Sequence, residues 1–348
     1  MHDALRIPEL FVNIFSFLNA SDLLSCALVC KLWSEDAQIA RWKVCNVTLK
    51  ALLQRLAPLD GLDELGLPDE VNGQYSTLRI NFKDISSQDW EGFLSTTGQV
   101  THLHVTRPCL HPSSVTLLQS LLSTYGGDLF PNLKSLELDF DAIEVPTVGF
   151  ALSPSLRTFK ATSYGYDDLG AIFYRLHPHS TNIDTVDLWM ERGSSRFQGQ
   201  FYPNLRILKY ACKSFTGEAW AALADAPLLE DLDISVYMSD IPIVHDVTFP
   251  ALKRLHMEDM EAGLTLALML GSHMPVLEAA SMEEIPLRKH HQSGLRQHLA
   301  DNSPVFKGIA FVDVEETDEG HRSLIGTLLA VHPLLGFFLS MLRFLFGL

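Results

Sequence analysis

The chain has 348 residues, of which 47% are hydrophobic and 20% charged, and its formal net charge is −16. This composition excludes a disordered chain and is typical of a globular protein. The acidic balance argues against nucleic acid as a partner, because phosphate contacts need clustered Lys and Arg. Residues 1–60 carry six basic and six acidic residues, so the negative excess lies entirely after residue 60.

Residues 7–33 predict two short helices that carry more apolar surface than they can bury. Pro8 suits the first turn of a helix, where its missing N–H costs nothing. Leu10, Ile14 and Leu18 then follow at helical spacing, and residues 19–22 form a break that supplies N-cap residues for a second helix over about 23–33. Three phenylalanines of the first helix remain outside this stripe. The excess apolar face therefore needs a cover, from the rest of the chain or from a partner.

These residues, in this order and spacing, resemble the F-box motif over roughly residues 5–50, with Ile7 in place of the motif's first leucine. Residues 37–44 resemble its third helix. An ordinary helical cap on a larger fold is the alternative interpretation. The resemblance implies binding to the Skp adaptor, and through it to a cullin–RING ubiquitin ligase, by helix-in-groove recognition. The adaptor contacts that it implies are Ile7, Pro8, Leu10, Ile14, Phe15, Leu18, Leu23, Val29, Cys30 and Trp33.

The five cysteines form no Cys-x-x-Cys pair and are odd in number, which indicates reduced, buried thiols. No basic region followed by an apolar run begins the chain, so we expect no secretory signal and a cytoplasmic or nuclear location. Residues 44 to about 58 read as a helix, and the F-box with this helix forms a first domain, 1–57. Residues 58–77 are rich in Pro, Gly and acids, which predicts a linker.

Residues 78–322 contain a recurring six-residue phrase in which the first, fourth and sixth residues are apolar. From Leu133 to Leu277 its copies begin 23, 27, 22, 24, 23 and 25 residues apart. Each phrase predicts a short strand, and the segments 114–124, 217–226 and 263–273 predict returning helices. Because one copy cannot bury its own apolar face, neighbouring copies must stack.

This pattern resembles an irregular leucine-rich repeat solenoid, often found after F-boxes. It departs from the usual repeat because the Asn or Cys that follows the third apolar residue is absent from every copy. A generic α/β domain with coincidental leucine spacing is the alternative. The predicted fold class is thus α/β, with an N-terminal helical F-box followed by an irregular leucine-rich repeat solenoid.

In such a fold, the residue between the second and third apolar positions of each phrase projects outward. Along the stack these residues alternate in charge, which predicts either a recognition face or, as we favour, cross-strand pairing. They are Glu137, Lys160, Asp187, Lys209, Asp233 and His256.

Long loops are expected over 139–153, 190–202, 237–248 and 283–303. Aromatic residues near the strand ends are candidate substrate anchors, because aromatics dominate interface energetics; packing beneath their own loops is the alternative. The candidates are Trp189, Phe197, Tyr202 and Tyr237.

No hydrolase, phosphate-binding, dinucleotide-binding or zinc-protease motif occurs in the sequence. The basic, histidine-containing stretch 288–291 reads as a solvated loop, since adjacent histidines do not share a helix face. We therefore expect no catalytic residue, no metal site and no cofactor, and hence no enzyme.

The C-terminal segment 323–348 is an apolar helix by sequence. Residues 324–342 carry no formal charge and are long enough to span a membrane, although His332-Pro333 near the centre opposes a lipid-exposed helix. A helix packed on the solenoid, a membrane tail and an error in the gene prediction all remain open.

The sequence as a whole predicts a substrate-recognition subunit of a Skp–cullin–F-box ubiquitin ligase, which docks the Skp adaptor through the F-box and an unknown protein substrate through the repeats. The alternative is a scaffold that binds proteins through the repeats without leading to their degradation. Neither hypothesis involves nucleic acid.

Overall fold

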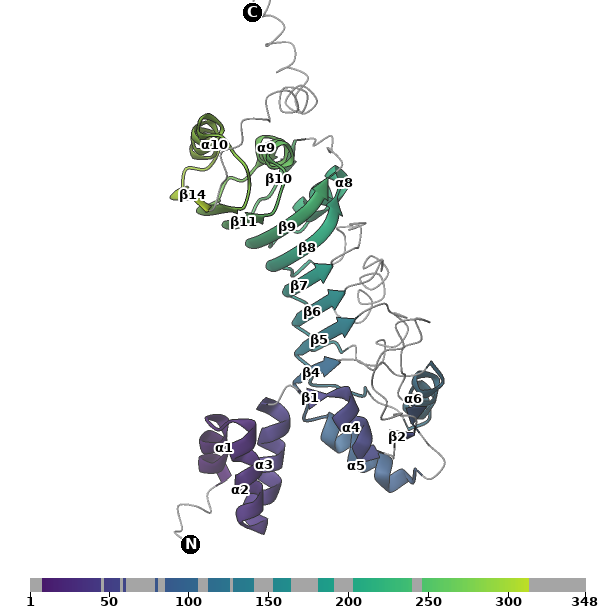
Figure 1. Cartoon of the computed structure of the whole chain (residues 1–348). Helices are drawn as coiled ribbons and strands as arrows, with labels where there is room; N and C mark the ends of the chain where they lie inside the picture. Colours follow the sequence, from purple (N-terminus) through teal and green to yellow (C-terminus); the bar gives the residue numbers. More distant parts are fainter. Residues whose placement is uncertain are drawn as a thin grey trace, which may run out of the picture. The chain divides into compact units, whose positions relative to one another are not determined.

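The structure, a computed structural model, describes residues 8–44, 47–56, 59–60, 79–80, 85–105, 112–125, 128–140, 153–163, 181–190, 203–239 and 246–312 (Figure 1). The chain divides into two compact units, Met1–Phe140 with Glu144–Lys160 and Asp141–Ile143 with Ala161–Leu348. The predicted C-terminal segment 323–348 and almost all of the predicted linker 58–77 lie outside the described residues.

The first unit opens with three helices, α1 (Pro8–Ser16), α2 (Ala20–Val29) and α3 (Lys31–Val44). The predicted second helix over 23–33 is wrong at both ends. It begins three residues earlier, at Ala20, and it ends before Cys30, whose extended backbone separates α2 from α3. Trp33 therefore lies in the third helix, which begins six residues earlier than the 37–44 that the sequence predicted. The predicted cap is confirmed, since the Asn19 side chain accepts hydrogen bonds from the backbone N–H groups of Ser21 and Asp22, at 2.9 and 3.0 Å.

The rest of the first unit alternates short strands with helices. Its elements are β1 (Val47–Thr48), α4 (Leu49–Leu56), β2 (Leu59–Asp60), β3 (Arg79–Ile80), α5 (Ser87–Thr97), β4 (His102–Val105), α6 (Pro112–Tyr125), β5 (Ser135–Phe140) and the start of β6 (Thr158–Ser163). Strands β1, β4 and β5 are parallel, with Leu103 of β4 in register with Val47 and Leu136, and β6 follows β5 in the sheet.

The second unit continues the same pattern in its own elements. These are β7 (Thr185–Met190), β8 (Ile207–Phe215), α8 (Gly217–Ala224), β9 (Asp231–Ser239), β10 (Val247–Thr248), β11 (Arg254–Glu258), α9 (Ala262–Leu270), β12 (Ser272–His273), β13 (Ala279–Glu283), α10 (Lys289–Asn302) and β14 (Gly308–Val312). The order β7-β8-β9-β11-β13-β14 follows the chain, and each pair of neighbouring strands in this order is parallel. The predicted α/β class, with a helical N-terminus followed by a solenoid-like parallel sheet, is confirmed.

The repeated apolar positions form the core of this sheet. The second apolar residue of each phrase falls in one register row, Leu208, Leu232, Leu255, Ala280 and Ile309, and all five side chains are buried. Successive copies are also hydrogen-bonded just before their strands begin. The backbone N–H of the second residue in one copy donates to the backbone carbonyl of the second residue in the preceding copy. The donor–acceptor pairs are Glu230 to Arg206, Lys253 to Glu230 and Glu278 to Lys253, each at 2.8 Å. One copy therefore sets the register of the next.

The Pro-Asn turns that precede some copies have a structural role. Asn132 Nδ2 donates to the carbonyl of Gly98 at 2.7 Å, and Asn204 Nδ2 donates to the carbonyl of Thr181 at 3.0 Å. Each amide therefore ties its turn to an earlier turn of the same unit.

The missing Asn of the usual repeat is replaced by an apolar side chain. After β11 and β13, Asp259 and Glu284 adopt φ of 55° and 54°, and Met260 and Ile285 then enter the core. The Asp259 N–H donates to the Glu283 carbonyl, and the Glu284 N–H donates to the Val312 carbonyl, at 3.2 and 3.1 Å. Hydrogen bonds to the next strand thus satisfy the turn without a side-chain cap.

The helices α6, α8 and α9 confirm the predicted returning segments, although α9 ends at Leu270 and residues 272–273 form β12. The expected loop over 283–303 is wrong: residues 289–302 form α10, which buries Leu295 and Leu299. The spacing of these two leucines, one helical turn apart, could have predicted α10 from the sequence. No helix among the residues that the structure describes is long and apolar enough to cross a membrane.

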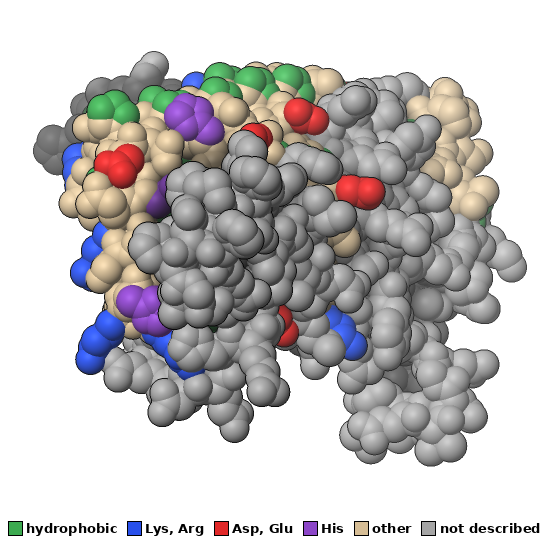
Figure 2. Space-filling view, turned by 90° about the horizontal axis from the view of Figure 1, so that it is seen from above, with side chains coloured by type: hydrophobic (Ala, Val, Ile, Leu, Met, Phe, Trp, Pro, Cys, Tyr) green, Lys and Arg blue, Asp and Glu red, His purple; other side chains and the backbone are tan. Residues whose placement is uncertain are grey.

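Figure 2 shows one face of the molecule. Among the described residues visible there, hydrophobic side chains gather along the upper edge, while acidic, basic and histidine side chains lie at separate points.

Candidate functional site

The helices α1, α2 and α3 share a small core. Phe15, Leu23 and Ala37, one from each helix, are buried together. The rings of Phe15 and Trp33 meet edge to face, with centroids 6.3 Å apart. This core uses only one side of α1 and of α2.

The other side of α1 and α2 leaves large apolar side chains in solvent. Leu10, Ile14 and Phe17 follow one another at helical spacing, and Phe17, just past the end of α1, is 88% exposed. On α2, Leu28 and Val29 are 80% and 61% exposed, and Leu24 lies one turn before Leu28. Scattered exposed leucines are ordinary, but six large exposed apolar side chains within residues 10–29 are typical of an interaction surface. We call these six residues the exposed apolar set.

The ten predicted adaptor contacts divide between this set and the core. Leu10, Ile14 and Val29 are exposed and belong to the set. Phe15 and Leu23 are buried, and Leu18, Cys30 and Trp33 are half-buried. Pro8 begins α1, but its side chain, like all of Ile7, lies outside the described residues. The sequence prediction did not include Phe17, Leu24 and Leu28, although surplus phenylalanines and a second leucine stripe were visible in the pattern.

Comparison with known families agrees with this geometry. Residues 8–42, which span α1, α2 and most of α3, match the family model described as F-box-like. Residues 8–42 form an F-box-like domain. No curated protein matches the chain.

Among solved structures, 14 chains match. One is the crystal structure of a protein from Bacteroides fragilis, with 17% sequence identity and a TM-score of 0.31. The match covers 59% of this chain and 61% of that one, so the chain spans about three fifths of that protein's length.

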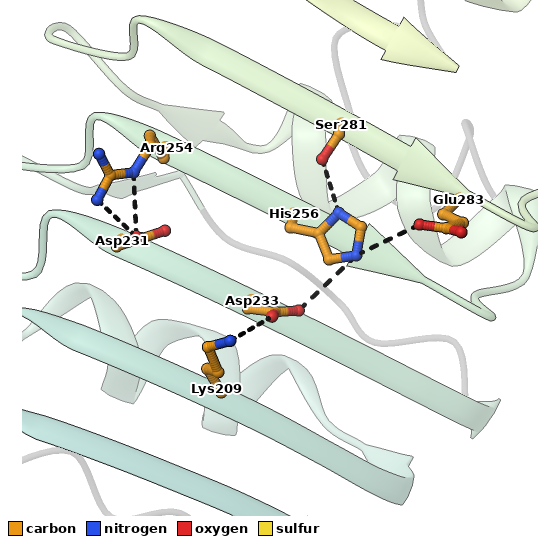
Figure 3. Close-up of polar contacts among 7 residues, drawn as sticks. All are labelled: Lys209, Asp231, Asp233, Arg254, His256, Ser281 and Glu283. Carbon is orange, nitrogen blue, oxygen red and sulfur yellow. Dashed lines mark hydrogen bonds and ion pairs between the residues drawn. The ribbon is translucent and has the colours of Figure 1, made fainter. Parts of the chain in front are cut away.

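The outward face of the sheet in the second unit carries three rows of paired charges. In the row nearest the start of the strands, Glu230 lies 2.7 Å from both Arg206 and Lys253, and Glu278 pairs with Lys307 at 2.5 Å. The hydrogen bond from Lys253, with the charges of Lys253 and Arg206, lowers the pKa of Glu230. In the neighbouring register row Arg254 donates to Asp231 through two nitrogens, at 2.7 and 3.0 Å (Figure 3).

The next outward row contains the alternating charges of the sequence pattern. Asp233 lies 3.8 Å from Lys209 and 3.9 Å from His256, and His256 lies 3.9 Å from Glu283. The other ring nitrogen of His256, Nδ1, forms a 2.6 Å hydrogen bond with Ser281 (Figure 3). Over β8–β13 the favoured interpretation, cross-strand pairing, therefore describes these residues.

The predicted substrate aromatics are not brought together by the described residues. Trp189 is half-buried in β7, in register with Ala211. Tyr237 lies in β9, where its backbone alone is described, and Phe197 and Tyr202 lie outside the described residues. Their role in substrate binding stays a prediction.

The other thiol and imidazole groups that we considered in the described part of the chain do not form a reactive or metal-binding site. Burial raises the pKa of the Cys212 thiol to about 12, which keeps it protonated and unreactive at neutral pH. The rings of His290 and His291 lie side by side at the start of α10. Over the described ranges, no group of three or more His, Cys, Asp or Glu side chains is placed to hold a metal ion.

Proposed function

We propose that this chain is a substrate-recognition subunit of a Skp–cullin–F-box ubiquitin ligase. The F-box-like domain supports a role in protein interaction. The observation that carries the finer proposal is the exposed apolar set on α1 and α2. Six large side chains of the F-box-like domain are exposed there, and a bound adaptor would cover them.

Docking of these side chains in an apolar groove on the adaptor would remove them from water, which is the driving force of helix-in-groove recognition. The buried residues Phe15, Leu23 and Ala37 hold the helices in place for this contact. Phe17 and Leu28, the two most exposed members, are the strongest candidates for anchors, because truncation of a few large central side chains removes most of the energy of an interface.

Affinity for purified Skp adaptor, measured by biolayer interferometry, tests this proposal. Replacement of Leu10, Ile14 and Leu28 by Ala removes three exposed contacts and leaves the core of the domain intact. We expect affinity to fall roughly 100-fold, since each lost contact of this kind costs about 1 kcal/mol or more.

A matched control replaces Leu228 and Val305, which are exposed apolar residues in turns of the second unit. The L228A/V305A variant should bind the adaptor as the wild type does. If the wild type does not bind, or if both variants bind equally well, the adaptor proposal is wrong. Circular dichroism of each variant establishes that the helices are retained.

The second step of the proposal is the delivery of a protein bound by the repeats. Stable-isotope proteomics of cells with and without the chain separates a ligase receptor from a scaffold. A receptor lowers the level of the protein that it binds, and a scaffold leaves that level unchanged.

A further inference from the structure

Four carboxylates lie together where β11 and β13 end. Glu258 and Glu283 are register partners on these neighbouring parallel strands, and Asp259 and Glu284 are the residues that follow each of them. We call these four residues the strand-end acids. Like charges directly opposite one another on adjacent strands destabilise a sheet, so this arrangement has a cost in the free protein.

The strand-end acids lack the compensation that the acids at the other end of the same strands have. There, Arg or Lys pairs with Glu230, Asp231 and Glu278. Among the residues that the structure describes, no Lys or Arg forms an ion pair with a strand-end acid, and the only contact with a basic side chain is that of Glu283 with His256, at 3.9 Å. The pKa values of two of these carboxyl groups are raised accordingly. Burial and the charges of Asp259, Glu283 and Asp233 raise the pKa of Glu258. The hydrogen bond and the charge of Asp259 raise the pKa of Glu284.

A second observation concerns Ser235 on β9, the register partner of Glu258. Alternation along β9 places Ser235 on the same face of the sheet as Asp233, which Figure 3 shows beside His256. Ser235 is only 5% exposed, and among the residues that the structure describes its hydroxyl has no hydrogen-bond partner. A buried hydroxyl without a partner costs free energy. Next to a group of carboxylates, such a hydroxyl gives an incoming cationic donor one more acceptor.

We propose that the strand-end acids, with Asp233 and Ser235, bind a Lys- or Arg-containing segment of the protein substrate. A ligand ammonium or guanidinium group would neutralise the repulsion between Glu258 and Glu283 and donate hydrogen bonds to carboxylate and hydroxyl oxygens. At the start of β9, β11 and β13, Glu230, Asp231 and Glu278 already have Arg or Lys partners, so the strand ends are the better place for a further cation. This inference rests on the proposed function only in naming the basic segment as part of a substrate.

The test measures the affinity of the full-length chain for labelled eight-residue peptides by fluorescence anisotropy. One peptide carries four lysines, a second four arginines and a third four glutamates, each with Gly and Ser between. The E258Q/E283Q variant removes two strand-end charges and preserves side-chain shape. The control, E218Q/D225N, removes two charges from exposed acids at the ends of α8.

We expect the basic peptides to bind the wild type and the glutamate peptide not to bind. Affinity should fall about tenfold in E258Q/E283Q and less than twofold in E218Q/D225N, because each partly exposed ion pair adds only a modest amount. E258Q/E283Q should also unfold at a higher temperature than the wild type, since it relieves repulsion in the free protein; a variant that lost binding through misfolding would unfold at a lower one.

Ser235→Ala is the sharper variant, because it leaves the net charge unchanged and removes only the buried hydroxyl. We expect it to weaken binding of the arginine peptide about threefold. Equal losses in E258Q/E283Q and E218Q/D225N would show a nonspecific effect of the chain's acidity, and absence of binding to either basic peptide would also overturn the inference. The adaptor variants of the F-box-like domain should keep full peptide affinity, so the two proposals fail separately.

Discussion

The F-box-like domain and the parallel sheet of the second unit differ in how completely they bury their apolar side chains. In the sheet, the apolar residues of the repeat face inward, and paired charges cover the outward side. In the helices α1 and α2, one face closes a small core and the other leaves Phe17, Leu28 and four further large side chains in solvent. The stacking of repeats lets each copy cover the next, whereas three short helices have too little interior for all their apolar residues. Exposure of this kind therefore indicates a surface that a partner covers.

The largest expected effect is at a buried leucine of the sheet, and an exposed leucine of the F-box-like domain provides the contrast. Leu232→Ala, at a fully buried position of β9, should lower the free energy of unfolding by about 2–5 kcal/mol, because it removes packing contacts and leaves a cavity. Leu28→Ala, at an exposed position of α2, should change it by less than about 0.5 kcal/mol. Urea unfolding followed by circular dichroism measures both. A loss in Leu28→Ala as large as that in Leu232→Ala would mean that α2 is covered within the chain, and the comparison would break.

A second prediction concerns the buried polar groups of the second unit. Trp220 Nε1 donates to the Ser272 hydroxyl at 2.8 Å, and that hydroxyl donates to the Leu268 carbonyl at 2.6 Å. Ser272→Ala leaves the buried indole N–H without an acceptor, so we expect a loss of about 1–3 kcal/mol in the same urea experiment. Ser293→Ala is the control, because that hydroxyl is exposed and donates to the carbonyl of Lys289 within α10. Equal losses of unfolding free energy in the two variants would mean that the buried hydrogen bond from Trp220 to Ser272 does not stabilise the fold.

The sequence predicted the repeat better than it predicted the surfaces. The spacing of Leu205, Leu229 and Leu252 was sufficient to place β8, β9 and β11, because each apolar triplet has only one way to alternate on a buried strand. The sequence could not show that Cys30 ends α2, since an extended residue between two helices leaves no distinct pattern there. It also missed α10, whose polar residues outweigh its two buried leucines.

The candidate sites were less accessible to sequence reasoning for a physical reason. The F-box pattern identified the right segment, but it could not distinguish Phe15 from Phe17, since these phenylalanines are two residues apart at the end of a short helix and only the fold decides which one enters the core. The strand-end acids were not predicted either. Glu258 and Glu283 are 25 residues apart in the chain, and only the register of β11 with β13 makes them neighbours.

A smaller effect is expected in the ion-paired row. Glu230→Gln weakens pairs with Arg206 and Lys253, and both are partly exposed, so we expect a loss of about 0.5–1 kcal/mol that shrinks at high salt. The contacts hold the pKa of Glu230 below its ordinary value in the folded chain. This contribution is therefore present above the pKa of an unfolded glutamate, and it is lost as the pH falls through the lower, folded pKa. Urea unfolding at neutral pH in low and high salt measures it, and a salt-independent loss would contradict the ion-pair explanation.

Glu258→Gln should have the smallest effect among these charge and packing variants, and it should raise the free energy of unfolding where the others lower it. The pKa of Glu258 is raised in the folded chain, by burial first and then by neighbouring acids. Folded protein thus holds this proton more tightly than unfolded protein does. In the wild type, the group's contribution to stability falls as the pH rises from the ordinary pKa of glutamate through the raised, folded value. Gln cannot ionise, so the variant should be more stable than the wild type at neutral pH, and this advantage should vanish below about pH 4.3, the pKa of an unfolded glutamate. Urea unfolding of both proteins across this pH range measures the difference. A variant that is less stable at neutral pH would show that Glu258 stabilises the free sheet, which would remove the repulsion from which the basic-segment site was inferred.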